Sequence, residues 1–368
     1  MRILHINCNY MGTKLHQTMI EHLNPYVKEN KVFCPIYSGS QLVTNPNSNV
    51  LVSRCFNAMD RAFFLMKSKK ITTSVQKQVD ILEFDCIHAY TLFTDGNCAL
   101  ECKKKYRIPY IVAIRATDFL FFKYRINLRK RGINILKHAS YIIFLADNSK
   151  ERFIRKYVPK RFQNEIINKT VVIPNGIDDF WLHNKYYRVN EDNKFRNKQI
   201  TLCCVAQIIK RKNIPNICEA MEILKSQGWR IELQVIGKII DKKEYNKIAN
   251  HSEISYISPL KKEKLINRYR EADIFVLPSK GETFGLVYAE AMSQGLPVIY
   301  SKDEGFDGQF QEGVVGYHVN PKDPKSIANA IIQVCDKYNL LSKNATKLSD
   351  KFDWNNIIQS YLKIYSTL

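Results

Sequence analysis

The chain has 368 residues and a mass of 43.0 kDa, with 45% hydrophobic and 25% charged residues. This length predicts about two domains, and the composition excludes a disordered, collagen-like or low-complexity protein. The 56 basic and 35 acidic residues give a net charge of +21, which predicts an anionic partner: nucleic acid, a membrane surface or a phosphorylated substrate.

The N-terminal sequence MRILHINCNY predicts a buried first strand rather than a secretory signal, because Asn7 and Asn9 interrupt the apolar core that a signal needs. No apolar run approaches the roughly 18 residues that span a bilayer. The ten cysteines form no CxxC motif, as expected for reduced thiols in a cytoplasmic protein. No histidine is spaced with a cysteine pair as in a zinc site, so we expect no metal.

Short apolar runs alternate with longer amphipathic runs along most of the chain. This alternation predicts an α/β protein with parallel sheets covered by helices on both faces. The predicted strands are residues 3–7, 86–89, 110–115, 141–146, 171–174, 202–206, 231–236, 254–257, 274–277 and 298–300. The predicted helices include residues 98–106, 215–226, 261–271, 286–294 and 326–338.

The alternation is interrupted once, between Pro174 and Gln199. There the motif IPNGID leads into a polar stretch, and a Pro-Asn-Gly turn of this kind is typical of a domain boundary. We therefore expect two Rossmann-like domains of similar size, residues 1–176 and 177–351, followed by a terminal helical segment at 352–368.

The segment PSKGETFGLVYAEAMSQGLPV, residues 278–298, has the pattern of a strand end, a loop and a helix. A loop at the carboxyl end of a parallel strand is where open α/β sheets bind ligands. The free amides of Gly285, Leu286 and Val287 would open the helix and form an anion site for phosphate.

Two carboxylates, Glu282 and Glu290, stand eight positions apart in this segment. An ionised carboxylate only accepts hydrogen bonds, which suits the hydroxyl groups of a sugar or a ribose. Each glutamate also has a structural alternative. Glu282 could complement the helix dipole, and Glu290 could be a solvated helix position.

The segment resembles the E-x7-E region of the retaining glycosyltransferases of family 4, which have the GT-B fold. The resemblance covers essentially the whole chain and implies two Rossmann-like domains that face each other across a cleft. The first would bind the acceptor and the second the nucleotide sugar, and the terminal helix would cross back to the first. The other stretches that agree are IPNGID at 173–178, VAQIIKRKN at 205–213, EGVVGYHVNPKDP at 312–324 and FDWNNIIQSYLKIY at 352–365.

The resemblance also implies roles for single residues. Glu290 would bind the ribose of the donor, and Glu282 would lie beside the transferred sugar and the developing charge. The amides around Phe284, Gly285 and Leu286 would contact the sugar and the diphosphate.

Lys212 matches the lysine with which the family neutralises the diphosphate, but Gln207 stands where the family has an arginine. Lys210 and Arg211 could replace that arginine or could simply be solvated. Lys212 and the helix amides would stabilise the departing nucleotide, so we expect a reaction that needs neither metal nor cofactor.

The first half offers weaker matches. Gly12 is the only glycine where the family has a glycine-rich loop near the donor phosphates. Arg115 stands where a family histidine often ends a strand. We therefore expect Arg115 and Asp118 to be catalytic residues in the cleft, with Asp118 in contact with sugar or acceptor hydroxyls. A structural Arg–Asp pair explains the same residues equally well, and His88 is expected to be a core histidine.

Positive charge is concentrated in residues 101–170, and within them the segment 119–138 interleaves apolar and basic side chains. This pattern is typical of a surface that lies on anionic lipid. A helix with one face in the core would explain it too, and single-stranded nucleic acid would leave the E-x7-E region unexplained. The basic residues are Lys123, Arg125, Arg129, Lys130 and Arg131.

Together these features predict a cytoplasmic enzyme bound peripherally to the inner face of the membrane. It would transfer a monosaccharide from a UDP- or GDP-linked donor to a growing glycan, on a lipid carrier used for cell-surface polysaccharide. The alternatives are a nucleotide-sugar epimerase or hydrolase on the same fold and, from the charge alone, a nucleic-acid-binding protein; we expect no nucleic acid.

Overall fold

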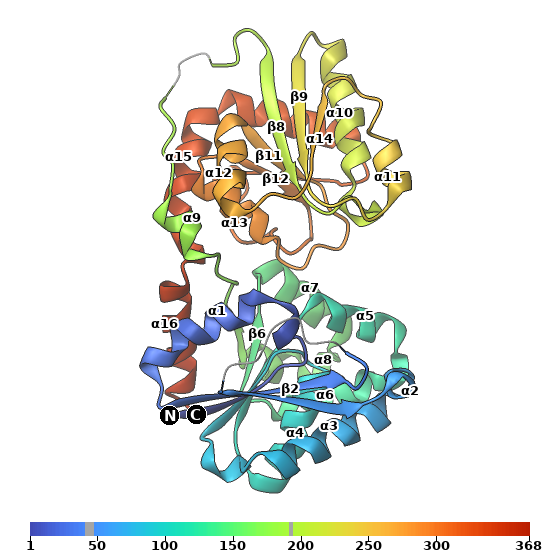
Figure 1. Ribbon diagram of the computed structural model, residues 1–368, viewed down its shortest axis with the longest axis vertical. Helices are drawn as coiled ribbons and strands as arrows, with labels where there is room; N and C mark the ends of the chain where they lie inside the picture. Colours follow the sequence, from blue (N-terminus) through green and yellow to red (C-terminus); the bar gives the residue numbers. More distant parts are fainter. Residues whose placement is uncertain (41–47, 191–193) are drawn as a thin grey trace. The chain divides into compact units, whose positions relative to one another are not determined.

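The computed structural model describes residues 1–40, 48–190 and 194–368, which form two compact units (Figure 1). The first unit consists of Met1–Asn175 and Trp354–Leu368, and the second of Gly176–Asp353. Each unit is a parallel sheet with helices packed on it. The predicted α/β class is therefore confirmed.

The first unit has a seven-stranded sheet in the order β3-β2-β1-β4-β5-β6-β7, and all its strand pairs are parallel. Ile3 lies opposite both Asn30 and Cys86, so the chain order reverses at β1. The strands are β1 Arg2–Ile6, β2 Glu29–Tyr37, β3 Val50–Phe56, β4 Cys86–Ala89, β5 Tyr110–Ala113, β6 Tyr141–Phe144 and β7 Thr170–Val172.

Helices cover both faces of this sheet. Leu4 and Ile87 belong to the core shared with α3, α4 and α6, whereas Ile3 and Ile111 belong to the core shared with α1 and α16. The helix α16 comes from the end of the chain and lies beside α1 (Figure 1). The helices are α1 Lys14–Leu23, α2 Ala58–Ala62, α3 Phe64–Gln78, α4 Thr94–Tyr106, α5 Ala116–Tyr124, α6 Arg129–His138, α7 Asp147–Tyr157, α8 Lys160–Ile167 and α16 Trp354–Tyr365.

The second unit has a six-stranded parallel sheet in the order β10-β9-β8-β11-β12-β13. Its strands are β8 Gln199–Val205, β9 Arg230–Ile236, β10 Ile254–Ile257, β11 Ile274–Leu277, β12 Val298–Ser301 and β13 Gly316–Val319. Its helices are α9 Asp179–His183, α10 Ile214–Ser226, α11 Lys242–Asn246, α12 Lys262–Glu271, α13 Leu286–Ser293, α14 Pro324–Asp336 and α15 Tyr338–Leu348. The strand order reverses between β8 and β11, and a ligand crevice is expected outside the carboxyl ends of these two strands.

All ten predicted strands are present, and β2, β3 and β13 are additional. All ten cysteines lie in the described residues and are free. None of the described helices combines the length and apolarity that crossing a membrane requires.

Candidate functional site

Two loops meet at the reversal point of the second sheet, residues 206–213 after β8 and residues 278–285 after β11. The backbone amide of Lys280 donates to the carbonyl of Arg211 at 2.7 Å. The side-chain amide of Asn213 donates to the carbonyl of Pro278 at 3.1 Å. These bonds hold the two loops side by side, so the residues they carry share one site.

Lys212 and Glu282 form an ion pair across the two loops. The Lys212 Nζ lies 2.5 Å from Glu282 Oε2, and the two side chains are only 12% and 11% exposed. The guanidinium of Arg211 lies 3.8 Å from the same oxygen and donates to the carbonyl of Gly281 at 3.1 Å. The structure thus brings Lys212, Arg211 and Glu282 together.

The loop that carries Glu282 is hydrogen-bonded to the loop after β12. Gly281 N–H donates to Glu304 Oε1 at 2.9 Å, and Gly305 N–H donates to the carbonyl of Glu282 at 3.1 Å. A Cβ on Gly305 would lie 2.1 Å from the carbonyl oxygen of Thr283. Glu304 and Gly305 were not predicted, although a glycine shortly after a strand at the same sheet edge was a usable signal.

The helix α13 opens at the same place. Gly285 precedes it with φ = +80°, a conformation that favours glycine. The first amides of the helix, those of Leu286 and Val287, have no acceptor within it and are suited to bind an anion. Phe284 is 3% exposed and its ring packs on Phe352, so only its backbone can contact a ligand.

Glu290 lies in α13 and has a hydroxyl as its neighbour rather than a cation. Tyr269, which is fully buried and was not predicted, donates its hydroxyl to Glu290 Oε2 at 3.5 Å. Burial raises the pKa of Glu290 to about 7. Within the described residues no ion pair engages this carboxylate, so it can accept hydrogen bonds from ligand hydroxyls.

In the part of the chain that the structure describes, the side chains of Gln207 and Lys210 form no ion pair or hydrogen bond with this arrangement. Both side chains are exposed in the loop after β8. Of the two residues considered as replacements for the family's arginine, Arg211 contacts the site through Glu282 and Gly281.

The first unit holds Gly12, Arg115, Asp118 and His88. A Cβ on Gly12 would meet nothing within 4 Å. The guanidinium of Arg115 donates to the carbonyl of Tyr90 at 3.3 Å. His88 is fully buried, with its Nδ1 2.7 Å from the hydroxyl of Tyr365, as expected for a core histidine.

The carboxylate of Asp118 is buried and is hydrogen-bonded to backbone amides of the first unit. It accepts hydrogen bonds from the backbone amides of Arg115, Leu92 and Phe93 at 2.8, 3.3 and 3.4 Å. Burial raises its pKa to about 6, against the effect of these amides. The geometry favours the structural alternative, with backbone amides as the partners in place of the arginine side chain.

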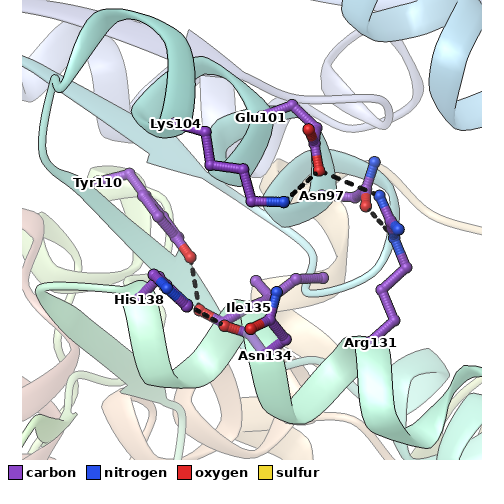
Figure 2. Close-up of polar contacts among 8 residues, drawn as sticks. All are labelled: Asn97, Glu101, Lys104, Tyr110, Arg131, Asn134, Ile135 and His138. Atoms are coloured by element: carbon purple, nitrogen blue, oxygen red, sulfur yellow. Dashed lines mark hydrogen bonds and ion pairs between the residues drawn. The ribbon is translucent and has the colours of Figure 1, made fainter.

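Two of the five predicted membrane-contacting residues hold helices together. Arg131 donates to Asn97 Oδ1 and lies 3.3 Å from Glu101, which ties α6 to α4 (Figure 2). Arg129 donates to the carbonyl of Phe122 at 2.6 Å. The other three, Lys123, Arg125 and Lys130, are exposed, and contact of this surface with lipid stays a prediction.

One group of side chains in the described residues has the spacing of a metal site. Glu222, His251 and Glu253 offer ligand atoms within 4.8 Å of one another. The ammonium of Lys225 already pairs with Glu222 at 3.1 Å and with Glu253 at 2.6 Å. This cation neutralises the glutamates, and we assign no metal to the group.

The chain matches two family models, "Glycosyltransferase Family 4" over residues 29–179 and "Glycosyl transferases group 1" over residues 188–350. It is 24% identical to an uncharacterized glycosyltransferase of Methanocaldococcus jannaschii, over 83% of this chain and 81% of the relative. It is 26% identical to the capsular polysaccharide biosynthesis glycosyltransferase CapM of Staphylococcus aureus, over 73% and 72% of the two chains.

A further relative is the alpha-monoglucosyldiacylglycerol synthase of Acholeplasma laidlawii, 26% identical over 66% of this chain and 65% of the relative. Among solved structures, Anabaena HepE in complex with UDP-glucose has a TM-score of 0.70 and 17% identity, with 100% of each chain covered. This structural likeness shows a shared fold.

Proposed function

Because this chain belongs to the glycosyltransferases, with the family 4 model over residues 29–179 and the group 1 model over residues 188–350, and has the GT-B fold, we propose that it transfers a monosaccharide from a nucleotide-diphosphate sugar to a growing glycan. The observation that carries the proposal is the Lys212–Glu282 pair beside the open amides of α13. Cation, amides and carboxylate together match the chemistry of a sugar diphosphate.

The donor would bind in the second unit. Lys212 and the amides of Leu286 and Val287 would hold the diphosphate, and Glu290 would accept hydrogen bonds from the ribose hydroxyls. HepE was solved with UDP-glucose, which supports a UDP-linked sugar as the first donor to test.

Cleavage of the sugar–diphosphate bond leaves negative charge on the departing nucleotide. Lys212, with Arg211 beside it, and the α13 amides are positioned before the reaction, and fixed charges of this kind lower the barrier without reorganisation. Glu282 would stabilise positive charge that develops on the sugar. We propose that this chemistry proceeds without metal and with retention of the anomeric configuration.

The acceptor would be a glycan on a lipid carrier, used for cell-surface polysaccharide. One relative is named for capsular polysaccharide biosynthesis and another for a glucosyldiacylglycerol product. Lys123, Arg125 and Lys130, next to the exposed side chains of Leu120 and Ile126, would attach the protein to anionic lipid at the cytoplasmic face.

Thermal unfolding in the presence of UDP- and GDP-linked sugars tests the donor site. At a concentration of 100 Kd a donor adds about 2.7 kcal/mol of stability, a rise of roughly 5–10 °C in Tm for a unit of this size. We expect Lys212→Met and Glu290→Gln to lose most of this rise. The matched controls Lys243→Met and Glu219→Gln, which change exposed residues on α11 and α10, should keep it; equal rises in all four variants would contradict the proposed site.

A further inference from the structure

The helix α3 has two stripes, and only one of them is used to cover the sheet. Ser68, Ile71 and Val75 are buried against the first unit. The other stripe, with residues at the spacing of successive helix turns, borders an open groove next to β3. Since β3 is the edge strand of its sheet, none of the strands in the described residues lies beyond it to cover this stripe.

The groove has a volume of about 780 Å³, within the roughly 300–1,000 Å³ that is usual for small-molecule sites. Its floor is organised by hydrogen bonds. Ser74 Oγ lies 2.6 Å from Ser53 Oγ, and the Gln78 amide donates to Ser74 Oγ at 2.7 Å. The lining residues are Cys55, Met66, Lys69, Lys70, Thr73, Ser74, Lys77 and Gln78.

The charge of the groove has one sign. Three lysines and no acidic residue line it, and the whole of α3 contains no acidic residue. The ammonium of Lys70 pairs with Asp60 at 2.7 Å. In the described part of the chain, Lys69 and Lys77 carry no ion pair, so their charge is available to an anion.

Apolar side chains continue from one end of the groove. Met66 lines the groove itself, and Phe63 and Leu65 beside it are each more than half exposed. Phe64 packs against Phe121 of α5 with ring centres 6.2 Å apart. This contact joins the groove end to the basic and apolar surface of α5, so an acyl chain at the groove would find apolar neighbours.

We propose that the groove between α3 and β3 binds an anionic lipid, with its phosphate head paired to Lys69 and Lys77 and its chain along Met66 and Cys55. Neither half of this ligand would suffice alone. The lysines select the negative charge, and the apolar lining selects the chain, as for amphipathic ligands at membrane interfaces. The inference concerns binding in the first unit and does not depend on the transfer reaction.

Calorimetric titration of the full chain with monomeric dodecyl phosphate tests the site. We expect one equivalent to bind to the unchanged protein. Lys69→Glu/Lys77→Glu should weaken binding at least tenfold, and so should Thr73→Trp, which fills the groove without changing its charge. The control Lys14→Glu/Lys28→Glu, with the same charge change at exposed positions on the first unit, should bind as the unchanged protein does.

Two further ligands separate the parts of the proposal. Dodecyl maltoside has the same chain without the charge, and inorganic phosphate has the charge without the chain; each should bind at least tenfold more weakly than dodecyl phosphate. The proposal would be overturned if either groove variant bound dodecyl phosphate as tightly as the unchanged protein does. It would also be overturned if dodecyl maltoside or inorganic phosphate bound as tightly as dodecyl phosphate. The groove variants could also be less stable than the unchanged protein. A Tm above the titration temperature shows that a variant is folded during the titration, so that weaker binding does not result from unfolding.

Discussion

At the scale of single residues, the Lys212–Glu282 pair connects the stability of the second unit to its proposed chemistry. Removing one member of a buried pair leaves the other uncompensated. We expect Lys212→Met to lower the free energy of unfolding by about 2–4 kcal/mol, less if Arg211, 3.8 Å away, takes over. The double variant Lys212→Met/Glu282→Gln should recover part of the loss in urea unfolding, and additive losses would argue against direct coupling of the two residues.

Glu290 predicts a pH dependence of donor binding. Its pKa of about 7 in the structure means that the carboxylate is half protonated at neutral pH, whereas hydroxyl donors favour the ionised form. Donor affinity should therefore rise from pH 6 to pH 8, with release of a proton on binding. Calorimetry in buffers of different ionisation enthalpy measures this proton, and a pH dependence unchanged in Glu290→Gln would assign it elsewhere.

Gly305 is predicted to be a structural requirement of the Glu282 loop. A Cβ there would lie 2.1 Å from the Thr283 carbonyl, which is backbone and cannot move aside alone. Gly305→Ala should cost about 1–3 kcal/mol and weaken donor binding. As a control, Gly228→Ala introduces a Cβ with nothing within 4 Å at φ = +85°, so it should affect stability alone; equal donor binding in both variants would contradict this role.

At the scale of elements, α16 is attached to the first unit through a buried group of histidines and tyrosines. His88 contacts Tyr365 of α16 and stacks on Tyr90 with ring centres 4.2 Å apart. Burial lowers the pKa of His5 to about 4, that of His16 to about 3, and that of His88 well below its usual value. These histidines stay neutral in the folded state while the unfolded chain binds protons below about pH 6.5.

This difference predicts a loss of stability of the first unit as pH falls from 6.5 towards 4, since the unfolded state then binds more protons. Asp95 and Asp118 act in the opposite direction, because burial raises the pKa of each, to about 7 and about 6. The double variant His88→Phe/Tyr365→Phe removes one titrating group and should reduce the acid loss by about 2 kcal/mol. Urea unfolding, followed by tryptophan fluorescence in a chain with Trp354 as its only tryptophan, measures the stability of the first unit at each pH. If the double variant lost as much stability at low pH as the unchanged protein, the assignment to His88 would be wrong.

The strands show how far sequence patterns reach. Predicted strands are present because each is an apolar run bounded by polar residues, but the run at 110–115 ends as a strand at Ala113, since Arg115 begins the cap of α5. In β2, Pro35 weakened the strand pattern, although the strand pairs on both sides. The segment 119–138 contains the end of α5 and the whole of α6, which are separated by residues 125–128, and one face of α6 lies in the core.

The residues of the candidate site also fall into two groups, those that the sequence predicts and those that it does not. Glu282, Lys212 and Glu290 stand in recognisable local patterns and were predicted, whereas Tyr269, Glu304 and Gly305 belong to other segments that only the sheet order brings to the site. The position of Gly305 shortly after a strand was a usable signal, but the linear sequence does not show that this residue contacts the Glu282 loop. The assignment of these three residues therefore required the three-dimensional structure.

At the scale of the whole molecule, the net charge of +21 includes cations in different settings. Arg129 and Arg131 connect helices. In the proposed function, Lys212 would bind the donor and the exposed residues Lys123, Arg125 and Lys130 would bind lipid. We expect Lys123→Glu/Arg125→Glu/Lys130→Glu to lower the affinity for anionic vesicles, measured by flotation, by about a hundredfold or more. The estimate assumes roughly 1 kcal/mol of binding free energy per basic residue. The control Lys14→Glu/Lys28→Glu/Lys105→Glu should have a smaller effect, and equal effects would indicate diffuse attraction.

The central claim is that the protein transfers a sugar from a nucleotide donor to an acceptor. Nucleotide release from UDP- or GDP-linked sugars, measured with and without a lipid-linked glycan acceptor, tests it directly. We predict release that depends on the acceptor, with the sugar recovered on the glycan, and near-complete loss of both in Lys212→Met. Release at the same rate without acceptor, with free sugar as the product, would contradict the account and identify a hydrolase.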